Sequence, residues 1–331
     1  MLKNRLACAL AVMCAFVMCV SRCNAWNSTG HEIVAQIAYD QLSPNAKSII
    51  IGLLKGHPRV NEDLLHDEVR AKDDDLAMFL RAATWPDIVR YPAHPLTHLE
   101  NHPRWHYVDF PFETDGITGP KPELKWDGKS DPENLAEAMQ RAMAELNSPL
   151  TPKVRKAIAI CWVEHLVGDI HQPLHATSWF SREFPNGDQG GNLVVIKNGD
   201  GEVLNLHSYW DGMEGMSMDP ADIRKTADRI EGEHPAAGMK DKIADLDVVN
   251  WAQESLALAK SVVYLDGTLP HTTRHRPSTL PTGTRPATTM PTEAPELPAG
   301  YAEKGLATAD ERIALAGYRL AAVLEEIAKA N

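Results

Sequence analysis

The sequence is poor in cysteine, and most of its cysteines lie at the start of the chain. Of the five cysteines in 331 residues, only Cys161 lies beyond position 23. If the start of the chain is removed, no internal disulfide can form. Stability must then come from a hydrophobic core or from bound metal. Cys161 stands in an apolar stretch, and we expect it to be a buried packing residue.

Basic residues are also scarce. The chain has 33 lysines and arginines against 45 aspartates and glutamates, a net charge of −12 at pH 7. This balance excludes a broad basic surface that grips duplex nucleic acid through its phosphates. The composition, 44% hydrophobic and 24% charged residues, is ordinary for a soluble globular protein. It excludes collagen-like, coiled-coil and wholly disordered chains.

Only one long hydrophobic run occurs, and it lies at the N-terminus. Lys3 and Arg5 precede an apolar run over residues 6–20, and Ala25 is a small residue suited to cleavage. This order is typical of a secretory signal, and the run is shorter than the roughly 20 residues that a membrane span needs. We predict a signal peptide over residues 1–25 and a secreted or periplasmic protein beginning at Trp26, without stable membrane association. An uncleaved anchor is the alternative. Cleavage would leave a net charge of −15, because the signal holds three basic and no acidic residues.

Strand signals are few, and glycine-rich nucleotide-binding motifs and repeats are lacking. Leu193–Ile196 and Val203–Leu206 flank an Asn-Gly-Asp-Gly turn, which predicts one small β-hairpin. Elsewhere, apolar spacing and capping residues predict helices. We expect them over residues 30–41, 45–55, 73–84 (closed by a proline), 130–147, 151–170, 219–231, 247–264 and 308–330. The fold class is therefore mainly α, with one helical domain over residues 26–331.

One segment departs from this pattern. Between Pro270 and Pro298, proline and threonine supply 15 of 29 residues, and phenylalanine, tryptophan and tyrosine are absent. Such a stretch cannot bury enough apolar surface to offset the entropy lost on ordering. We predict a disordered insertion between the last two helices, at about 270–298.

Histidines paired with carboxylates are the strongest chemical signal. His165 and Asp169 stand four residues apart in a predicted helix, so they share one face at about 6 Å and can bind one ion. A proline then ends this helix, so His175 can return to its end, whereas His171 is expected to lie off the ligand face. His207 and Asp211 repeat the four-residue spacing.

Two shorter motifs add further candidates. Trp-Pro-Asp87 and Trp-His106-Tyr-Val-Asp109 also place imidazoles beside carboxylates. Histidine and aspartate together suit zinc, which takes N and O ligands. Solvated surface histidines are the alternative. Two helical pairs inside an apolar frame favour metal.

The predicted N-terminus would supply an unusual ligand. His31 lies five residues after Trp26. A free α-amino group has a pKa of about 7.7–8.0 and binds metal once deprotonated. With the carbonyl of its own residue it can close a five-membered chelate ring.

These motifs together resemble a known family. WNSTGHEIVAQIA, TWPDIVR, WHYVD, HLVGDIHQPLH, GGN and NLHSYWD occur in this order over residues 26–211. They resemble the zinc-dependent single-strand-specific nucleases and 3′-nucleotidases of the nuclease P-one type. The resemblance covers nearly the whole chain after residue 25, except the Pro/Thr-rich segment. It implies a mostly helical fold, shared with zinc phospholipase C, around three zinc ions.

The resemblance also implies a ligand set for each ion. One ion would bind Asp87, His106, His165 and Asp169, and a second would bind the Trp26 amino and carbonyl groups, His31 and Asp169. The third would bind His175, His207 and Asp211. Asp169 would bridge the first two ions.

Substrate-binding roles follow from the same resemblance. Asp87 and Arg90 would act on the water and the phosphate, and Tyr107 and Asp109 would stack and hydrogen-bond a base. Asn192 could contact substrate, although a role in its turn is equally consistent with Gly-Gly-Asn. The implied activity is hydrolysis of single-stranded DNA or RNA to 5′-phosphorylated products, and of 3′-mononucleotides. Its partners would be these substrates, and no protein partner is inferred.

Two other functions remain open at this point. A zinc phospholipase C would use a similar metal set on lipid headgroups, and a non-catalytic exported protein would only bind zinc. The lack of disulfides and the Pro/Thr-rich insertion depart from the fungal and plant pattern, and neither touches a ligand. Asn27-Ser28-Thr29 is a glycosylation sequon, but a glycan there would crowd the metal site.

Overall fold

The computed structural model describes residues 26–65, 74–274 and 290–331. The predicted signal peptide lies outside these residues. The helices are α1 (Ser28–Gln41), α2 (Pro44–Leu54), α3 (Asp74–Ile88), α4 (Thr97–Glu100), α5 (Leu135–Asn147), α6 (Lys153–His171), α7 (Leu206–Asp211), α8 (Pro220–Glu233), α9 (Lys240–Ala244), α10 (Val248–Leu258) and α11 (Tyr301–Ala330). The strands are β1 (Phe110–Glu113), β2 (Thr177–Phe180), β3 (Val194–Lys197), β4 (Val203–Asn205) and β5 (Thr272–Thr273). The predicted mainly α fold is confirmed.

Short helical turns connect these elements. Two turns matter for the site: the 3-10 turns η3 (Pro103–His106) and η4 (Pro173–Ala176). A π turn, η1 (Val60–Leu64), precedes α3, and another, η6 (Ala259–Val263), continues α10. Smaller 3-10 turns are η5 (Ala236–Gly238) and η7 (Leu265–Gly267).

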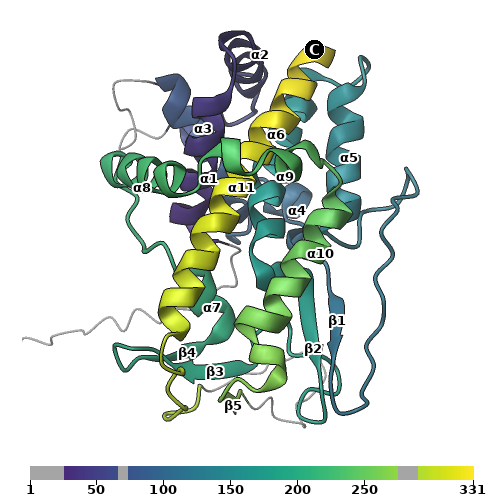
Figure 1. Ribbon diagram of the computed structural model, residues 1–331. Coiled ribbons are helices and arrows are strands. Elements are labelled where there is room, and N and C mark those ends of the chain that lie inside the picture. Colours follow the sequence, from purple (N-terminus) through teal and green to yellow (C-terminus); the bar gives the residue numbers. More distant parts are fainter. Residues whose placement is uncertain (1–25, 66–73, 275–289) are drawn as a thin grey trace, which may run out of the picture.

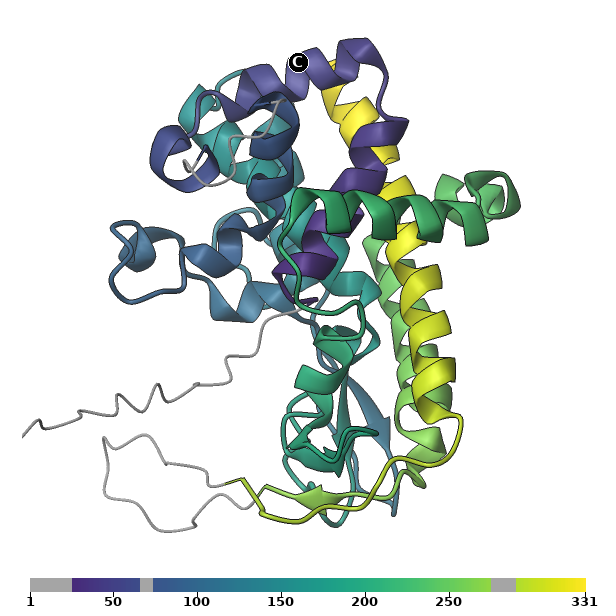
Figure 2. The same cartoon turned by 90° about the vertical axis from the view of Figure 1, so that its left-hand side faces the viewer.

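Helix α6 lies at the centre of the helical part (Figure 1; Figure 2). Every residue from Ala157 to His171 is buried. A helix that is buried on all sides has no solvent face to show amphipathic periodicity. It packs against α2, α3, α5 and α11, so any polar group it carries must find partners inside the protein.

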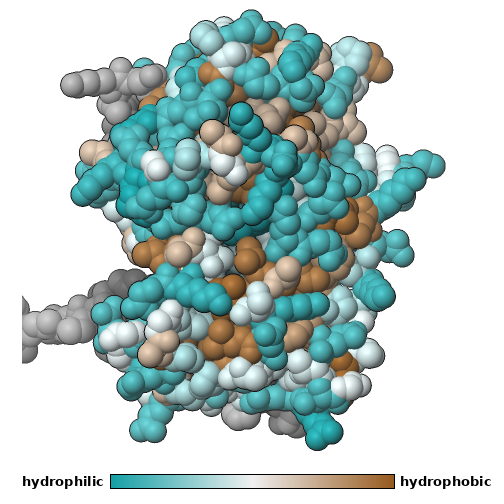
Figure 3. Space-filling view, viewed as in Figure 1, coloured by the Kyte–Doolittle hydropathy of each residue, from teal (hydrophilic) through white to brown (hydrophobic). Residues whose placement is uncertain are grey.

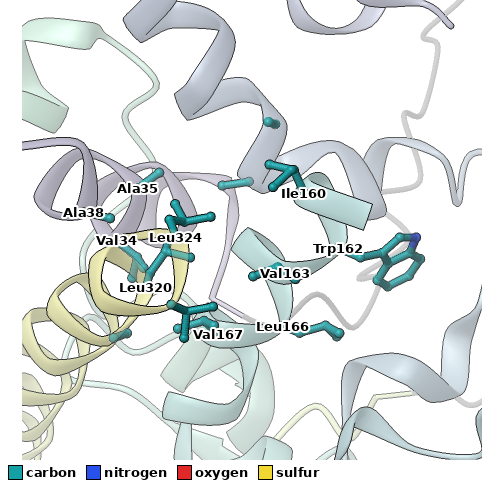
Figure 4. Close-up of a cluster of buried hydrophobic side chains, with 14 of the residues drawn as sticks. Val34, Ala35, Ala38, Ile160, Trp162, Val163, Leu166, Val167, Leu320 and Leu324 are labelled. Carbon is teal, nitrogen blue, oxygen red and sulfur yellow. The ribbon is translucent and has the colours of Figure 1, made fainter. Parts of the chain in front are cut away.

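The core around α6 is built from small and branched side chains on three helices. Figure 4 shows them on α1, α6 and α11: Val34, Ala35, Ala38, Ile160, Val163, Val167, Leu320 and Leu324. The alanines of α1 let the helix approach its neighbours closely, and the branched residues fill the space between them. This packing fixes α1 and α6 relative to each other.

The strands lie at the lower end of Figure 1. The predicted hairpin is β3–β4, and β5 extends it on the other side of β3. The prediction missed a second, parallel pair in which Phe110 of β1 lies opposite Thr177 of β2. Single-sequence patterns do not reveal this pair because each strand has only four residues.

The two ends of the Pro/Thr-rich segment are ordered. Thr272 and Thr273 pair with β3, and Lys197 bonds to the carbonyl of Pro295 and to Glu296. The prediction of disorder is therefore wrong for residues 270–274 and 290–298. Its middle, 275–289, lies outside the described residues.

Three helix boundaries differ from expectation. Pro86 was expected to end α3 but lies inside it, because the amide of Val89 still donates to the Trp85 carbonyl. Helix α5 begins after Asn134, whose side chain caps the Glu137 amide, rather than at Ser130. Helix α11 begins at Tyr301, about two turns before the predicted residue 308.

The outer surface is mostly polar. Hydrophilic residues dominate the face in Figure 3, and hydrophobic ones lie mainly across its middle and lower part. Within the described ranges, no helix is long and apolar enough to cross a membrane.

A buried ion cluster joins α10 and α11 to the end of α6. Glu254 accepts hydrogen bonds from Arg312 at 2.7 Å and from Arg319 at 2.8 Å. Arg312 also donates to the backbone carbonyl of His171, and Arg319 donates to its ring. Although partial burial opposes ionisation, the two guanidinium groups lower the pKa of Glu254 to about 2.

Replacement of Glu254 tests this cluster. Glu254→Gln leaves two buried guanidinium groups without a carboxylate, so we expect a loss of about 2 kcal/mol at pH 7, below the 3–5 kcal/mol of a fully buried pair because Glu254 is partly exposed. A carboxyl whose pKa is lowered by folding stabilises the fold at pH values above its unfolded pKa of about 4.3. This contribution is lost as the pH falls towards 2. The difference in free energy of unfolding between the unmodified protein and Glu254→Gln, measured by urea unfolding, should therefore shrink below pH 4. Glu123→Gln, at an exposed loop residue, should change stability by less than about 0.5 kcal/mol.

Candidate metal centre

Eight of the nine predicted metal ligands gather into three buried clusters. Within each cluster, one ligand atom of every member lies within 4.8 Å of the others. The clusters are His31–His165–Asp169, Asp87–His106–His165 and His175–His207–Asp211. Helices α1, α3, α6 and α7 and the turns η3 and η4 supply these side chains. Segments far apart in the sequence therefore meet around the last turns of α6.

His165 belongs to both of the first two clusters, and Asp169 lies against ligands of both. Oδ1 of Asp169 lies 3.2 Å from Nε2 of His31, and its Oδ2 lies 3.2 Å from Nδ1 of His106. The same Oδ2 lies 3.3 Å from Nε2 of His165, one helical turn earlier. The predicted four-residue pair on α6 is thus in contact, and Asp169 can reach both neighbouring positions. The prediction did not include His165 beside His31, where the two rings stack at 4.0 Å.

The third cluster matches the predicted grouping. Nε2 of His175 lies 3.1 Å from Nε2 of His207, which lies 3.6 Å from Oδ2 of Asp211. The other Asp211 oxygen accepts a 2.7 Å hydrogen bond from Gln172. One oxygen of Asp211 is thereby fixed and the other faces the imidazoles.

Backbone carbonyls fix the protonation of three of these histidines. Nδ1 of His165 lies 2.8 Å from the Ala83 carbonyl, and Nδ1 of His207 lies 2.6 Å from the Gly190 carbonyl. Nδ1 of His175 faces the carbonyl of His106 in the same way. A carbonyl only accepts, so each Nδ1 carries the proton and each Nε2 carries a lone pair. Two such lone pairs, 3.1 Å apart in the third cluster, repel each other unless a cation lies between them.

Burial sets the charge of the cluster members. It lowers the pKa of His31, His106, His165 and His175, and neighbouring imidazoles add to the effect for His31, His106 and His175. Burial raises the pKa of Asp169 and Asp211, and Asp87 adds repulsion at both. Neutral imidazoles are the form that binds metal, and a divalent cation would offset the carboxylates.

Orphaned polar atoms also point to a cation. Among the described residues, Oδ2 of Asp87, Nε2 of His31 and Oδ1 of Asp169 are buried without a hydrogen-bond partner. Buried polar atoms without partners are rare in folded proteins. The donor set, imidazole nitrogens with carboxylate oxygens, fits zinc.

A comparison with protein families identifies the family of this chain. Residues 26–329 match the S1/P1 Nuclease family. The chain belongs to the S1/P1 nuclease family. This match confirms the resemblance seen in the motifs, and it makes the chain a hydrolase of the nuclease type.

Curated relatives are similar over most of the chain. Nuclease S1 of Aspergillus oryzae is 25% identical over 329 residues, 92% of this chain and 92% of that protein. Endonuclease 2 of Arabidopsis thaliana is 24% identical over 236 residues, 70% of this chain and 67% of its own length. Endonuclease 1 of the same plant is 26% identical over 216 residues, covering 63% of this chain and 59% of the plant protein.

The first described residue of this family member, Trp26, is fully buried next to the site. The amide of the following Asn27 donates to the backbone carbonyl of Asp211 at 3.1 Å. The Asn27 side chain caps α1 and donates to the Gly215 carbonyl at 2.6 Å. These bonds fix the backbone beside Trp26 between His31 and the third cluster. They also bury the amide of the sequon, which argues against a glycan on the folded chain.

The predicted catalytic pair is in contact. Nη1 of Arg90 donates to Oδ1 of Asp87 at 3.0 Å, and the side chain of Arg90 is about one-fifth exposed. The Asp87 carboxylate therefore presents Oδ1 to Arg90, while its Oδ2 is buried without a hydrogen-bond partner among the described residues. Arg90 lies at the boundary between the cluster and solvent.

The predicted substrate residues lie along the segment that joins His106 to β1. Tyr107 is half-buried with an extended backbone, and it lies two residues before Asp109. Asp109 has an exposed edge, but the surrounding protein removes enough water from its carboxyl to raise the pKa to about 7, and repulsion from Asp188 adds to the effect. Asn192 follows two glycines whose carbonyls bond to His207, and its side chain donates to the Gln189 carbonyl at 2.8 Å.

Gly190 was named in the sequence analysis only as part of the Gly-Gly-Asn motif, and Asp188 and Gly168 were missed. Asp188 is fully buried and accepts from the amide of Gly191 at 2.8 Å and from the Tyr264 hydroxyl at 2.6 Å. This loop carries Gly190, whose φ of 59° lets its carbonyl face His207. Gly168 lies on α6 against the His31 ring. The Asp-Gln-Gly-Gly sequence at 188–191 could have indicated this loop. The contact of Gly168 with His31, in contrast, depends on how the two helices pack in the fold.

A fourth group, Glu233, His234 and Asp310, has a different character. Arg229 donates to both oxygens of Asp310, at 2.7 and 2.8 Å, and to Glu233 at 3.1 Å. A guanidinium already balances these carboxylates, so we interpret the group as a salt-bridge cluster.

Gly168→Ala tests the contact between α1 and α6. An added Cβ would lie 2.7 Å from Nδ1 of His31, too close for any side chain, so the ring must move away from Asp169. We expect a lower zinc content per chain, measured by atomic emission after dialysis. Gly52→Ala is the matched control, because a Cβ on this helical glycine meets nothing within 4 Å. Full zinc content in Gly168→Ala would contradict this role of the glycine.

Removal of metal should destabilise the fold. Without a cation, the buried carboxylates of Asp169 and Asp211 have too few partners. Treatment with a chelator is therefore expected to lower the thermal unfolding midpoint by several degrees, and added zinc should restore it. An unchanged midpoint at full metal removal would show that the clusters need no cation.

Proposed function

We propose that this family member is an exported, zinc-dependent phosphodiesterase that hydrolyses single-stranded DNA or RNA to 5′-phosphorylated products. We further propose that it hydrolyses 3′-mononucleotides. One observation carries the proposal: the Nε2 lone pairs of His165, His175 and His207 converge on buried aspartates at one end of α6. This arrangement, in a chain of a nuclease family, supports the proposal that three ions bind there.

The chain itself would hold and orient the phosphate. Arg90 has a guanidinium edge exposed beside Asp87, so it can bind a phosphate oxygen while Asp87 fixes its orientation. Oδ2 of Asp87, which has no hydrogen-bond partner among the described residues, faces the cluster and can accept a proton from water. Zinc, when bound, lowers the pKa of a coordinated water towards about 7 and offsets phosphate charge.

Selectivity for unpaired strands would come from two features. Tyr107 can stack any base, and Asp109 can hydrogen-bond a base edge. Three divalent ions against three aspartates would make the site locally positive within an acidic chain. A small positive site suits one flexible phosphate, whereas duplex binding draws on many lysines and arginines along a surface.

Export and N-terminal processing belong to the same proposal. The family match begins at residue 26, the residue expected to follow the cleaved signal. Trp26 is buried, and the Asn27 amide bonds to the backbone carbonyl of Asp211. A free amine on Trp26 would therefore be held close to the ligands His31 and Asp211. We propose that this amine and the Trp26 carbonyl complete the second ion's ligand set.

The activity test compares single strands, duplex and lipid. The purified mature protein should cleave a single-stranded oligonucleotide faster than its duplex and release 5′-phosphates, visible on a sequencing gel. Phosphatidylcholine, the substrate expected for a zinc phospholipase C, should remain intact. Faster cleavage of duplex DNA would overturn the strand preference, and hydrolysis of lipid alone would overturn the nuclease assignment.

Variants of the catalytic pair separate an enzyme from a zinc-binding protein. Arg90→Lys keeps the charge but loses the forked donor, so we expect kcat/KM to fall by about 10- to 100-fold at unchanged zinc content. Arg104→Lys, at an exposed arginine paired with Glu133, is the matched control and should leave activity unchanged. Zinc binding without chelator-sensitive hydrolysis in the unmodified chain would favour the non-catalytic alternative.

A further inference from the structure

We propose that Asp63 is a positioning residue that holds the Asp87–Arg90 segment in place from both of its ends. This inference rests on the proposed function, because it assigns the cause of the geometry at Asp87 and Arg90. Asp63 lies in the π turn η1, outside the metal clusters, and its side chain is only 5% exposed.

Three side chains donate to the Asp63 carboxylate. The Trp85 indole donates to Oδ2 at 3.0 Å, and Nε2 of His94 lies 3.0 Å from the same oxygen. Nε of Arg59 donates at 3.1 and 3.2 Å to the two oxygens. Nδ1 of His94 accepts from the Leu96 amide, so Nε2 carries the proton and donates. Every donor is therefore oriented towards one buried acceptor.

Two of these donors, Trp85 and His94, lie on either side of the Asp87–Arg90 segment. Trp85 precedes Asp87 by two residues, and His94 follows Arg90 by four. Inside this interval, the Arg90 amide bonds to the Asp87 carbonyl, and Arg90 Nη1 bonds to Oδ1 of Asp87. The end of α3 and the turn after it are thus joined through one carboxylate, which restricts the direction of Asp87 and Arg90.

The same segment also orients a metal ligand. The Ala83 carbonyl, two residues before Trp85, accepts the proton of Nδ1 of His165. Movement of Trp85 would therefore displace the partner of His165 as well as Asp87. Asp63 acts on two clusters without touching a predicted ligand or the substrate.

Charge and shape make the carboxylate hard to replace. Oδ2 accepts from Trp85, His94 and Arg59, and Oδ1 accepts from Arg59 as well, so both atoms must be acceptors. In Asp63→Asn, one of the two positions becomes an NH₂ group that faces a donor. An NH₂ group at the Oδ1 position faces Nε of Arg59, which keeps only its 3.2 Å bond to the other oxygen and loses its ion pair. An NH₂ group at the Oδ2 position instead faces the buried donors of Trp85 and His94 and leaves them without an acceptor.

The test combines kinetics with metal spectroscopy. For Asp63→Asn in the mature, zinc-loaded protein, we expect kcat on a single-stranded oligonucleotide to fall about tenfold or more, with a smaller change in KM. Cobalt-substituted protein should show an altered visible absorption spectrum, because the ligand geometry at Asp87 and His165 changes. The matched control is Asp75→Asn, an exposed carboxylate of α3 paired with Lys55, which should alter neither measurement.

A double-mutant cycle distinguishes positioning from general stabilisation. Trp85→Phe removes the indole donor and keeps the aromatic ring. If Asp63 acts through Trp85, the double variant should lose little more kcat than Asp63→Asn alone. Additive losses, or an unchanged kcat and cobalt spectrum in folded Asp63→Asn, would overturn the inference.

The unmodified protein is measured first. Lack of nuclease activity there would overturn the proposed function. The cobalt spectra of the variants would still test the effect of Asp63 on the clusters, so the two failures are distinguishable.

Discussion

The structure depends on one buried carboxylate, Asp169, surrounded by imidazoles at the centre of the molecule. It lies on a helix without a solvent face, within 3.2–3.3 Å of nitrogens from His31, His106 and His165. Burial disfavours its ionised form, and neutral imidazoles alone do not offset its charge. A divalent cation bound beside Asp169 would offset that charge. The stability of the core and the chemistry of the site would then depend on the same ion. The Glu254 cluster and the packing of α1 on α6 hold the helices that present these ligands.

The local part of the site could be predicted from sequence. The four-residue spacing of His165 and Asp169, and of His207 and Asp211, fixes which side chains share a helical face, and both pairs are found in contact. The mainly α fold follows equally from apolar periodicity. The motif order identified the family, which the match over residues 26–329 confirms. The roles of the ligands and the cleavage after Ala25 stay predictions.

The features that the sequence did not predict depend on contacts between distant segments. Asp63, Asp188 and Gly168 act through Trp85, Tyr264 and His31, which lie 22, 76 and 137 positions away, and no local pattern marks them. Pro86 remained inside α3 because only its own hydrogen bond is lost, and the ends of the Pro/Thr-rich segment are ordered because β3 offers an edge to pair with. Composition describes a segment in isolation, whereas pairing depends on its neighbours.

Anomalous scattering at the zinc edge from crystals of the exported protein would test most directly whether a processed N-terminus completes a three-ion site. We predict three peaks at the described clusters, one of them within bonding distance of a free amine on Trp26. Absence of zinc at all three clusters in active protein would contradict this description, as would an N-terminus other than Trp26.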